Sequence, residues 1–122
     1  MVPRDPLAAG LGLVLAALGL VGLLPGLELP LTSAHDLAHL LPGLVLAWAG
    51  LGTAAERAKR VAIAATGVAY LGVGAITLVA PDQVPVLLGI PAVANLVHLA
   101  LGVGLIGLAY AVGPITVDEA TA

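Results

Sequence analysis

The chain of 122 residues contains no cysteine, and only 9 % of its residues are charged. Without cysteine it forms no disulfide, holds no metal through a thiolate and has no cysteine nucleophile. A soluble domain carries about a quarter charged residues, so this composition is not typical of a water-soluble protein. The sequence also lacks the phosphate-binding, serine-elbow and zinc-protease motifs of common enzymes. We therefore expect a protein that is not an enzyme.

Long apolar runs take the place of the missing charge. Hydrophobic residues make up 61 % of the chain, and the mean hydropathy is +1.16. A helix rises about 1.5 Å per residue, so each run is long enough to cross a hydrocarbon layer about 30 Å thick. The sequence predicts one all-α transmembrane domain over residues 1–122, with four helices at about 7–24, 33–52, 61–80 and 92–113.

All four basic residues fall on one side of this four-span arrangement. Arg4 precedes the first span, and Arg57, Lys59 and Arg60 lie between the second and the third. The positive-inside rule then puts both termini in the cytoplasm. We expect a multi-pass protein of the cell membrane with the lipid bilayer as its partner. Four basic against seven acidic residues leave no basic patch for nucleic acid.

Two short motifs repeat along the chain, "HDLAHLLPG" at residues 35–43 and "ANLVHLALG" at residues 94–102. The alignment superposes Asp36 on Asn95, His39 on His98 and Gly43 on Gly102. Each motif opens an even-numbered span, and both hairpins enter the membrane from the same side. The sequence therefore predicts a four-helix bundle of two similar helical hairpins, related by a pseudo-two-fold axis along the membrane normal.

The predicted axis brings His39 and His98 to the same depth, below the outer surface. Asp36 lies three residues before His39, and Asn95 three residues before His98, so each pair shares a helix face. His35 lies one turn before His39. An uncompensated polar group is costly in hydrocarbon, so these side chains are expected to face the inside of the bundle.

The residues favour a structural interpretation of this cluster, with no cofactor. In a polar clasp, His39 bonds to Asn95 and His98 to Asp36 across the axis, which fixes how the hairpins pair. Ser33 and Asp36 also fit a capping box at the start of the second helix. The predicted role is that of a small structural or accessory membrane protein that self-associates or packs with a larger membrane complex.

Two ligand-binding interpretations remain open. His35, Asp36, His39 and His98 form a ligand set suited to zinc or copper, with the carboxylate as a ligand or orienting a ring. His39 and His98 could also be the axial ligands of a haem. Against haem, every arginine and lysine is predicted at the opposite side, which leaves no basic partner for the propionates.

Two further features concern packing. Tyr70 lies near the middle of the third span, so its hydroxyl is expected to find a partner inside the bundle or in a neighbouring chain. Small residues four apart let helices approach closely in lipid. Such pairs are Gly12/Ala16, Gly43/Ala47, Ala65/Ala69 and Ala100/Gly104.

The paired motifs resemble those of small four-span membrane proteins of bacteria and archaea that are grouped as a domain of unknown function. In that family H-N-x-x-H-x-x-x-G precedes a second motif, N-x-x-H-x-x-x-G. The matching residues are His35, His39 and Gly43 in the first motif and Asn95, His98 and Gly102 in the second. Asp36 stands where the family has asparagine, which favours a charged or metal-assisting role for it. The resemblance implies the four-span topology and no function.

Overall fold

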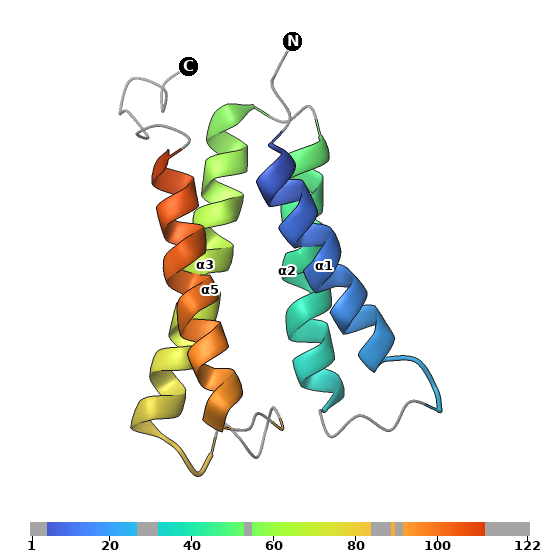
Figure 1. Ribbon diagram of the computed structural model, residues 1–122, viewed down its shortest axis with the longest axis vertical. Coiled ribbons are helices and arrows are strands. Elements are labelled where there is room, and N and C mark those ends of the chain that lie inside the picture. Colours follow the sequence, from blue (N-terminus) through green and yellow to red (C-terminus); the bar gives the residue numbers. More distant parts are fainter. Residues whose placement is uncertain (1–4, 27–31, 53–54, 84–88, 90–91, 112–122) are drawn as a thin grey trace.

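The computed structural model describes residues 5–26, 32–52, 55–83, 89 and 92–111, and the regular structure of these residues is entirely helical. The helices are α1 (Pro6–Gly22), α2 (Ser33–Leu51), α3 (Glu56–Val79) and α5 (Ala92–Ala111), which Figure 1 shows in their order along the chain. The predicted all-α class with four helices is confirmed. Residues 112–113, the end of the last predicted span, lie outside the described residues.

Helix α3 begins at Glu56 instead of near residue 61. Arg57, Lys59 and Arg60 therefore lie in its first two turns. The sequence had placed them in the connection before the helix. Alanine, glutamate, arginine and lysine are all strong helix formers, so the basic segment extends the helix. Lys59 is buried, and its Nζ atom lies 3.4 Å from Glu56 Oε1. Arg4, the remaining basic residue, lies outside the described residues.

The N-terminal cap of helix α2 is one residue earlier than the sequence predicted. Thr32 is the N-cap, and its Oγ1 accepts a hydrogen bond from the His35 backbone N–H at 3.3 Å. This satisfies one of the free donors of the first turn. The capping role predicted for Ser33 and Asp36 is therefore wrong. The Asp36 carboxylate instead lies against Gly22 of α1.

Each pair of successive helices forms an antiparallel hairpin, α1 with α2 and α3 with α5 (Figure 1). In the first hairpin the backbones approach closely: Gly12 lies against Ala47, and Gly43 lies against Ala16. Both small-residue pairs predicted for this hairpin are therefore at its interface.

The second hairpin uses other small residues. Its close contacts are Gly67 with Ile106, Gly74 with Leu99 and Gly102 with Leu71. The pairs predicted from the sequence, Ala65/Ala69 and Ala100/Gly104, are exposed on α3 and α5. They are therefore not at the close contact between these two helices.

The duplication of the hairpins extends through both helices of each. Buried residues at 8, 12, 15 and 19 of α1 correspond to buried residues at 63, 67, 70 and 74 of α3. Buried residues at 36, 43, 46 and 50 of α2 correspond to those at 95, 102, 105 and 109 of α5. The two alignments differ because α3 extends further at its end than α1 does and the connection that follows it is also longer. This hides the α1–α3 half of the repeat from a single alignment.

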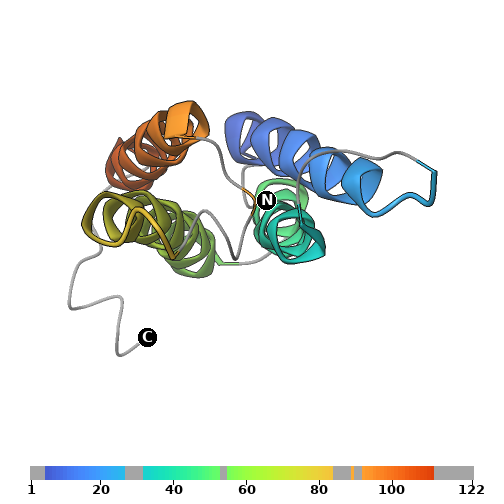
Figure 2. The same ribbon diagram turned by 90° about the horizontal axis from the view of Figure 1, so that it is seen from below.

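Viewed from its end, the bundle has α1 diagonally opposite α3 and α2 diagonally opposite α5 (Figure 2). A two-fold rotation about the long axis of the bundle exchanges the helices in this way. The second helix of each hairpin therefore faces its counterpart across the axis, which positions the candidate site.

The bundle is apolar outside and partly polar inside. Two helical segments, Glu56–Val79 and Val93–Ala111, are long and apolar enough to cross a membrane, whereas α1, with 17 residues, is apolar but shorter. Within the most apolar windows of the two segments, only 33 % and 28 % of the residues are buried. Length and composition thus support two of the four predicted spans.

Candidate metal centre

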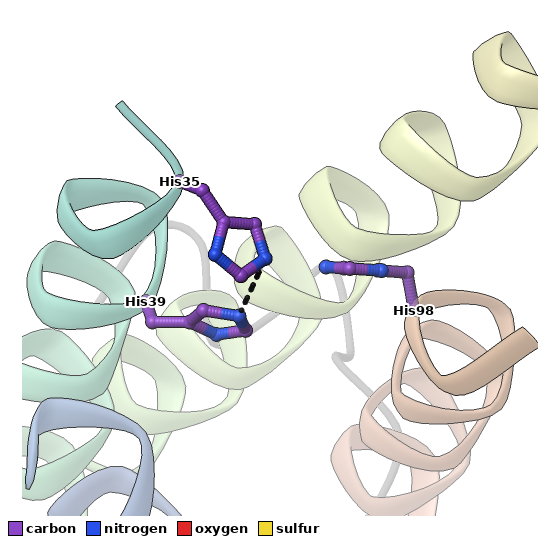
Figure 3. A group of neighbouring side chains, drawn as sticks. All are labelled: His35, His39 and His98. Atoms are coloured by element: carbon purple, nitrogen blue, oxygen red, sulfur yellow. Dashed lines mark hydrogen bonds between the residues drawn. The ribbon is translucent and has the colours of Figure 1, made fainter. Parts of the chain in front are cut away.

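Three imidazoles converge near one end of the bundle. His35 and His39 lie one turn apart on α2, and His98 lies on α5, with the rings directed toward one another (Figure 3). One ring nitrogen from each histidine lies within 4.8 Å of those of the other two. The ring centroids of His39 and His98 are 5.7 Å apart, so the prediction that these residues meet from two helices is confirmed.

The ring of His39 is held at both nitrogens. Its Nδ1 lies 2.9 Å from the Tyr70 hydroxyl of α3. Its Nε2 lies 3.2 Å from Nε2 of His35. Tyr70 is buried, so the expectation that its hydroxyl finds a partner inside the bundle is confirmed. The site therefore includes a residue that the sequence did not assign to it.

A proline determines which proton each group holds. Pro42 lies inside α2 and has no N–H, so the Ala38 carbonyl one turn earlier lacks its helical donor. The Tyr70 hydroxyl donates to that carbonyl at 3.4 Å. We assign the single hydroxyl proton to this carbonyl, which only accepts, so the hydroxyl oxygen accepts the other bond from the Nδ1–H of His39. The lone pair of His39 is therefore on Nε2, which faces His35.

His98 is oriented by its own helix. Its Nδ1 lies 2.8 Å from the Ala94 carbonyl oxygen, which only accepts, so Nδ1 carries the proton and Nε2 the lone pair. Histidine ligands of metals commonly donate their second N–H to a carbonyl or another polar group in this way. His39 and His98 thus both carry their lone pair on Nε2.

His35 has one unsatisfied ring nitrogen. With the lone pair of His39 on Nε2, the His35 Nε2–H donates to it, and the remaining lone pair of His35 is on Nδ1. That Nδ1 is buried and has no hydrogen-bond partner in the described part of the chain. Native proteins pair most buried polar atoms, so this nitrogen is a candidate to bind a ligand.

The carboxylate and the amide near the cluster face their own hairpins. Asn95 Nδ2 donates to the Gly74 carbonyl at 3.2 Å, and Asp36 lies against Gly22. The predicted clasp pairs, His39 with Asn95 and His98 with Asp36, are therefore wrong. Three residues turn a helix by about 300°, so a side chain three positions before a histidine points about 60° away from it. For the same reason Asp36 is not in the three-histidine group.

The geometry favours a small ion over a haem. Two axial imidazoles hold a haem iron from opposite sides of the macrocycle. Here the rings of His39 and His98 are nearly parallel, at 24°, and the His35 ring lies 4.5 Å and 5.8 Å from them. A macrocycle between His39 and His98 would displace His35, whereas one ion could contact all three.

A cavity of about 380 Å³ lies beside the cluster, between α2 and α3. Its buried polar wall consists of His35, Tyr70 and His98. The remaining lining residues are apolar: Ala34, Leu37, Ala38, Leu41, Pro42, Ala69 and Val73. The cavity offers space next to the imidazoles for a further ligand.

Comparison with known proteins identifies no relative. No family model matches the sequence, no curated protein matches it and no solved structure matches the fold. The resemblance to the four-span proteins of unknown function stays a prediction, so the site is interpreted from its own geometry.

Proposed function

We propose that the chain is a four-span integral membrane protein of the cell membrane. The exposed leucines, valines and isoleucines on all four helices support this, because soluble monomers rarely expose apolar patches above a few hundred Å². Arg57, Lys59 and Arg60 lie at the end of the bundle opposite the histidines. With that end in the cytoplasm, the histidine cluster is near the outer face.

We propose further that the protein binds a zinc or copper ion through His35, His39 and His98. The observation that carries this proposal is the convergence of three imidazole nitrogens within 4.8 Å. Tetrahedral zinc with nitrogen ligands at about 2.0–2.1 Å needs them about 3.3 Å apart, which is close to the 3.2 Å between Nε2 of His35 and Nε2 of His39. Binding of the ion moves the His35 proton from Nε2 to Nδ1, so that Nε2 becomes a ligand. A modest approach of His98 completes the set.

Such an ion has two consequences for the protein. It links α2 of one hairpin to α5 of the other, and so stabilises the pairing of the hairpins in proportion to its occupancy. It also keeps a position open toward the cavity, as metal sites that exchange ligands do. The proposed role is reversible metal binding at the outer face of the membrane.

Metal titration tests the proposal. The protein, purified without a histidine tag and stripped of metal, is titrated with Zn²⁺ and Cu²⁺ against a chelating dye. We expect one ion per chain, lost in the His39→Gln/His98→Gln variant, because glutamine keeps hydrogen bonding but not imidazole ligation. The Asp36→Asn variant is the matched control and keeps its ion. Equal binding by the histidine variant and the wild type would refute the site.

A second candidate role is the accessory one, in which the protein associates with itself or with a larger complex. Exposed small residues support it, since the described chain places no atom near Gly104 or Gly107 of α5. Small residues on an outer face let another helix approach closely. Mass measurement in a mild detergent tests it: an oligomer that Gly104→Leu dissociates supports the role, and a stable monomer contradicts it.

A further inference from the structure

The cavity beside the histidines has an inner and an outer wall of different character. The inner wall is made of His35, Tyr70 and His98, which are buried. The outer wall includes Leu37 and Leu41, whose side chains are 43 % and 58 % exposed. In the proposed membrane orientation that outer surface faces lipid, so a molecule dissolved in the bilayer can reach the inner wall without crossing water.

The lining selects an uncharged headgroup. Among the described residues that line the cavity there is no aspartate, glutamate, lysine or arginine. A charged head would therefore be buried without a permanently charged partner, which is costly in a membrane. Fatty-acid carboxylates and phosphates are disfavoured for this reason, and a neutral hydrogen-bonding head is favoured.

The inner wall specifies the chemistry further. His35 Nδ1 is a buried acceptor without a partner, so the fitting head donates a proton from a hydroxyl. Tyr70 and His98 present rings 5.7 Å apart and inclined by 28°, which suits a flat aromatic ring beside them. A cavity of about 150 Å³ accommodates benzene, and the cavity here has about 380 Å³, enough for a substituted ring.

We propose that this cavity binds the hydroquinone head of a lipid-dissolved molecule, with one ring hydroxyl donating to His35 Nδ1. The apolar tail lies along Leu37 and Leu41 toward the lipid. This inference rests on the proposed membrane placement but not on the metal, because the unpaired His35 nitrogen belongs to the metal-free arrangement.

The test compares three probes on metal-free protein in lipid nanodiscs, by calorimetry corrected for partition into empty discs. Decylubiquinol has the ring and the hydroxyl donors, decylubiquinone has the ring without donors, and farnesol has a hydroxyl without the ring. We expect saturable binding of decylubiquinol at one site, about tenfold tighter than that of decylubiquinone, as one unsatisfied buried hydrogen bond implies. Equal affinities of quinol and quinone, or tighter binding of farnesol, would overturn the assignment.

Two matched variants locate the binding. Ala69 and Ala75 are both exposed alanines of α3, but only Ala69 lines the cavity. Ala69→Phe fills the cavity and is expected to abolish quinol binding, while Ala75→Phe leaves it unchanged. A second plug, Leu37→Trp, repeats the test from α2. Quinol binding that survives both plugs would exclude this cavity.

Metal titration of the same samples separates the two proposals. We expect Ala69→Phe to bind its metal ion like the wild type, since no histidine is changed. Quinol binding without metal binding would remove the metal site and leave this inference intact. Metal binding without quinol binding would remove the quinol site and leave the metal site intact.

Discussion

At the scale of single residues, the assigned protonation of the site depends on one backbone carbonyl. Pro42 leaves the Ala38 carbonyl without a helical donor, and the Tyr70 hydroxyl supplies one. The hydroxyl then accepts from His39, which puts the lone pair of His39 on the nitrogen that faces His35. In the proposed metal site Tyr70 is therefore a positioning residue: it orients the ligand His39 without being a ligand itself.

Removal of the Tyr70 hydroxyl tests this assignment. In Tyr70→Phe the Ala38 carbonyl and His39 Nδ1 both lose their partner, at a cost of about 1–3 kcal/mol of unfolding free energy. Loss of such an orienting bond typically weakens metal binding about 10- to 100-fold. Thermal unfolding and zinc titration measure the two effects.

The control is Tyr110→Phe, because Tyr110 is 75 % exposed at the far end of α5. Tyr110→Phe should change neither the unfolding free energy nor the zinc affinity. A Tyr70→Phe protein with wild-type zinc affinity would show that the hydroxyl does not orient His39.

The residues of the site were predictable to different degrees. The spacing of His35 and His39 and the repeat that contains His98 were sufficient to bring the imidazoles together. The part played by Tyr70 was not predictable, because it depends on the relative depth of α2 and α3, which a sequence pattern does not contain. Asp36 lies outside the group of three histidines, because residues that share a helix face can still differ in direction by more than a ligand set tolerates.

At the scale of the helices, glycine determines how closely each hairpin packs. Gly12 of α1 lies against the α2 backbone at Ala47, whereas Gly10 of the same helix has no atom of the described chain near it. A side chain at position 12 must push the two helices apart. A side chain at position 10 points away from the bundle.

The pair Gly12→Val and Gly10→Val isolates this contact, since both variants add the same side chain to the same helix. We expect Gly12→Val to lower the unfolding free energy by about 1–3 kcal/mol, as overpacking typically does, and Gly10→Val to have little effect. Denaturation followed by circular dichroism measures both. Similar stabilities of the two variants would contradict the close packing of α1 on α2.

Substitution of the proline in α2 is expected to change the stability of the protein and its zinc affinity in opposite directions. In Pro42→Ala the restored N–H can bond the Ala38 carbonyl, so the helix gains a hydrogen bond. Tyr70 then competes for that carbonyl and holds His39 less firmly. We expect a higher unfolding temperature together with a weaker zinc affinity, and a variant that improves both would refute this part of the mechanism.

Helix existence was easier to predict than helix ends. Apolar runs identify all four helices, because each run is long enough to form a helix of several turns. The start of α3 was placed near residue 61 since charge was taken to mark a connection. The helix propensity of the residues from Glu56 to Arg60 extends the helix instead, and charged side chains at a helix end can lie at a membrane surface.

At the scale of the whole molecule, two similar hairpins join around a polar site. The sequence contains the α2–α5 half of the repeat as visible motifs. The α1–α3 half became apparent only from the buried positions of the structure, because the connections differ in length and the residues themselves differ, as with Leu15 and Tyr70. The histidine cluster and the basic start of α3 lie at opposite ends of the bundle, so the two ends differ chemically.

Because the chain contains no cysteine, introduced cysteines can show on which side of the membrane each end of the bundle lies. Ser33→Cys and Ala58→Cys each introduce one thiol at an exposed position, the first beside the histidines and the second beside the basic residues. A maleimide that cannot cross membranes should label intact cells through residue 33 alone, and residue 58 after permeabilisation. Labelling of both from the outside would contradict a membrane-spanning α2.

The central claim is that three imidazoles share one ion. X-ray absorption spectroscopy of the zinc-loaded protein tests it most directly, because it counts the imidazole nitrogens around the metal. We predict three imidazole ligands at about 2.0–2.1 Å. A first shell of oxygen atoms, or one with a single imidazole, would contradict the three-histidine site.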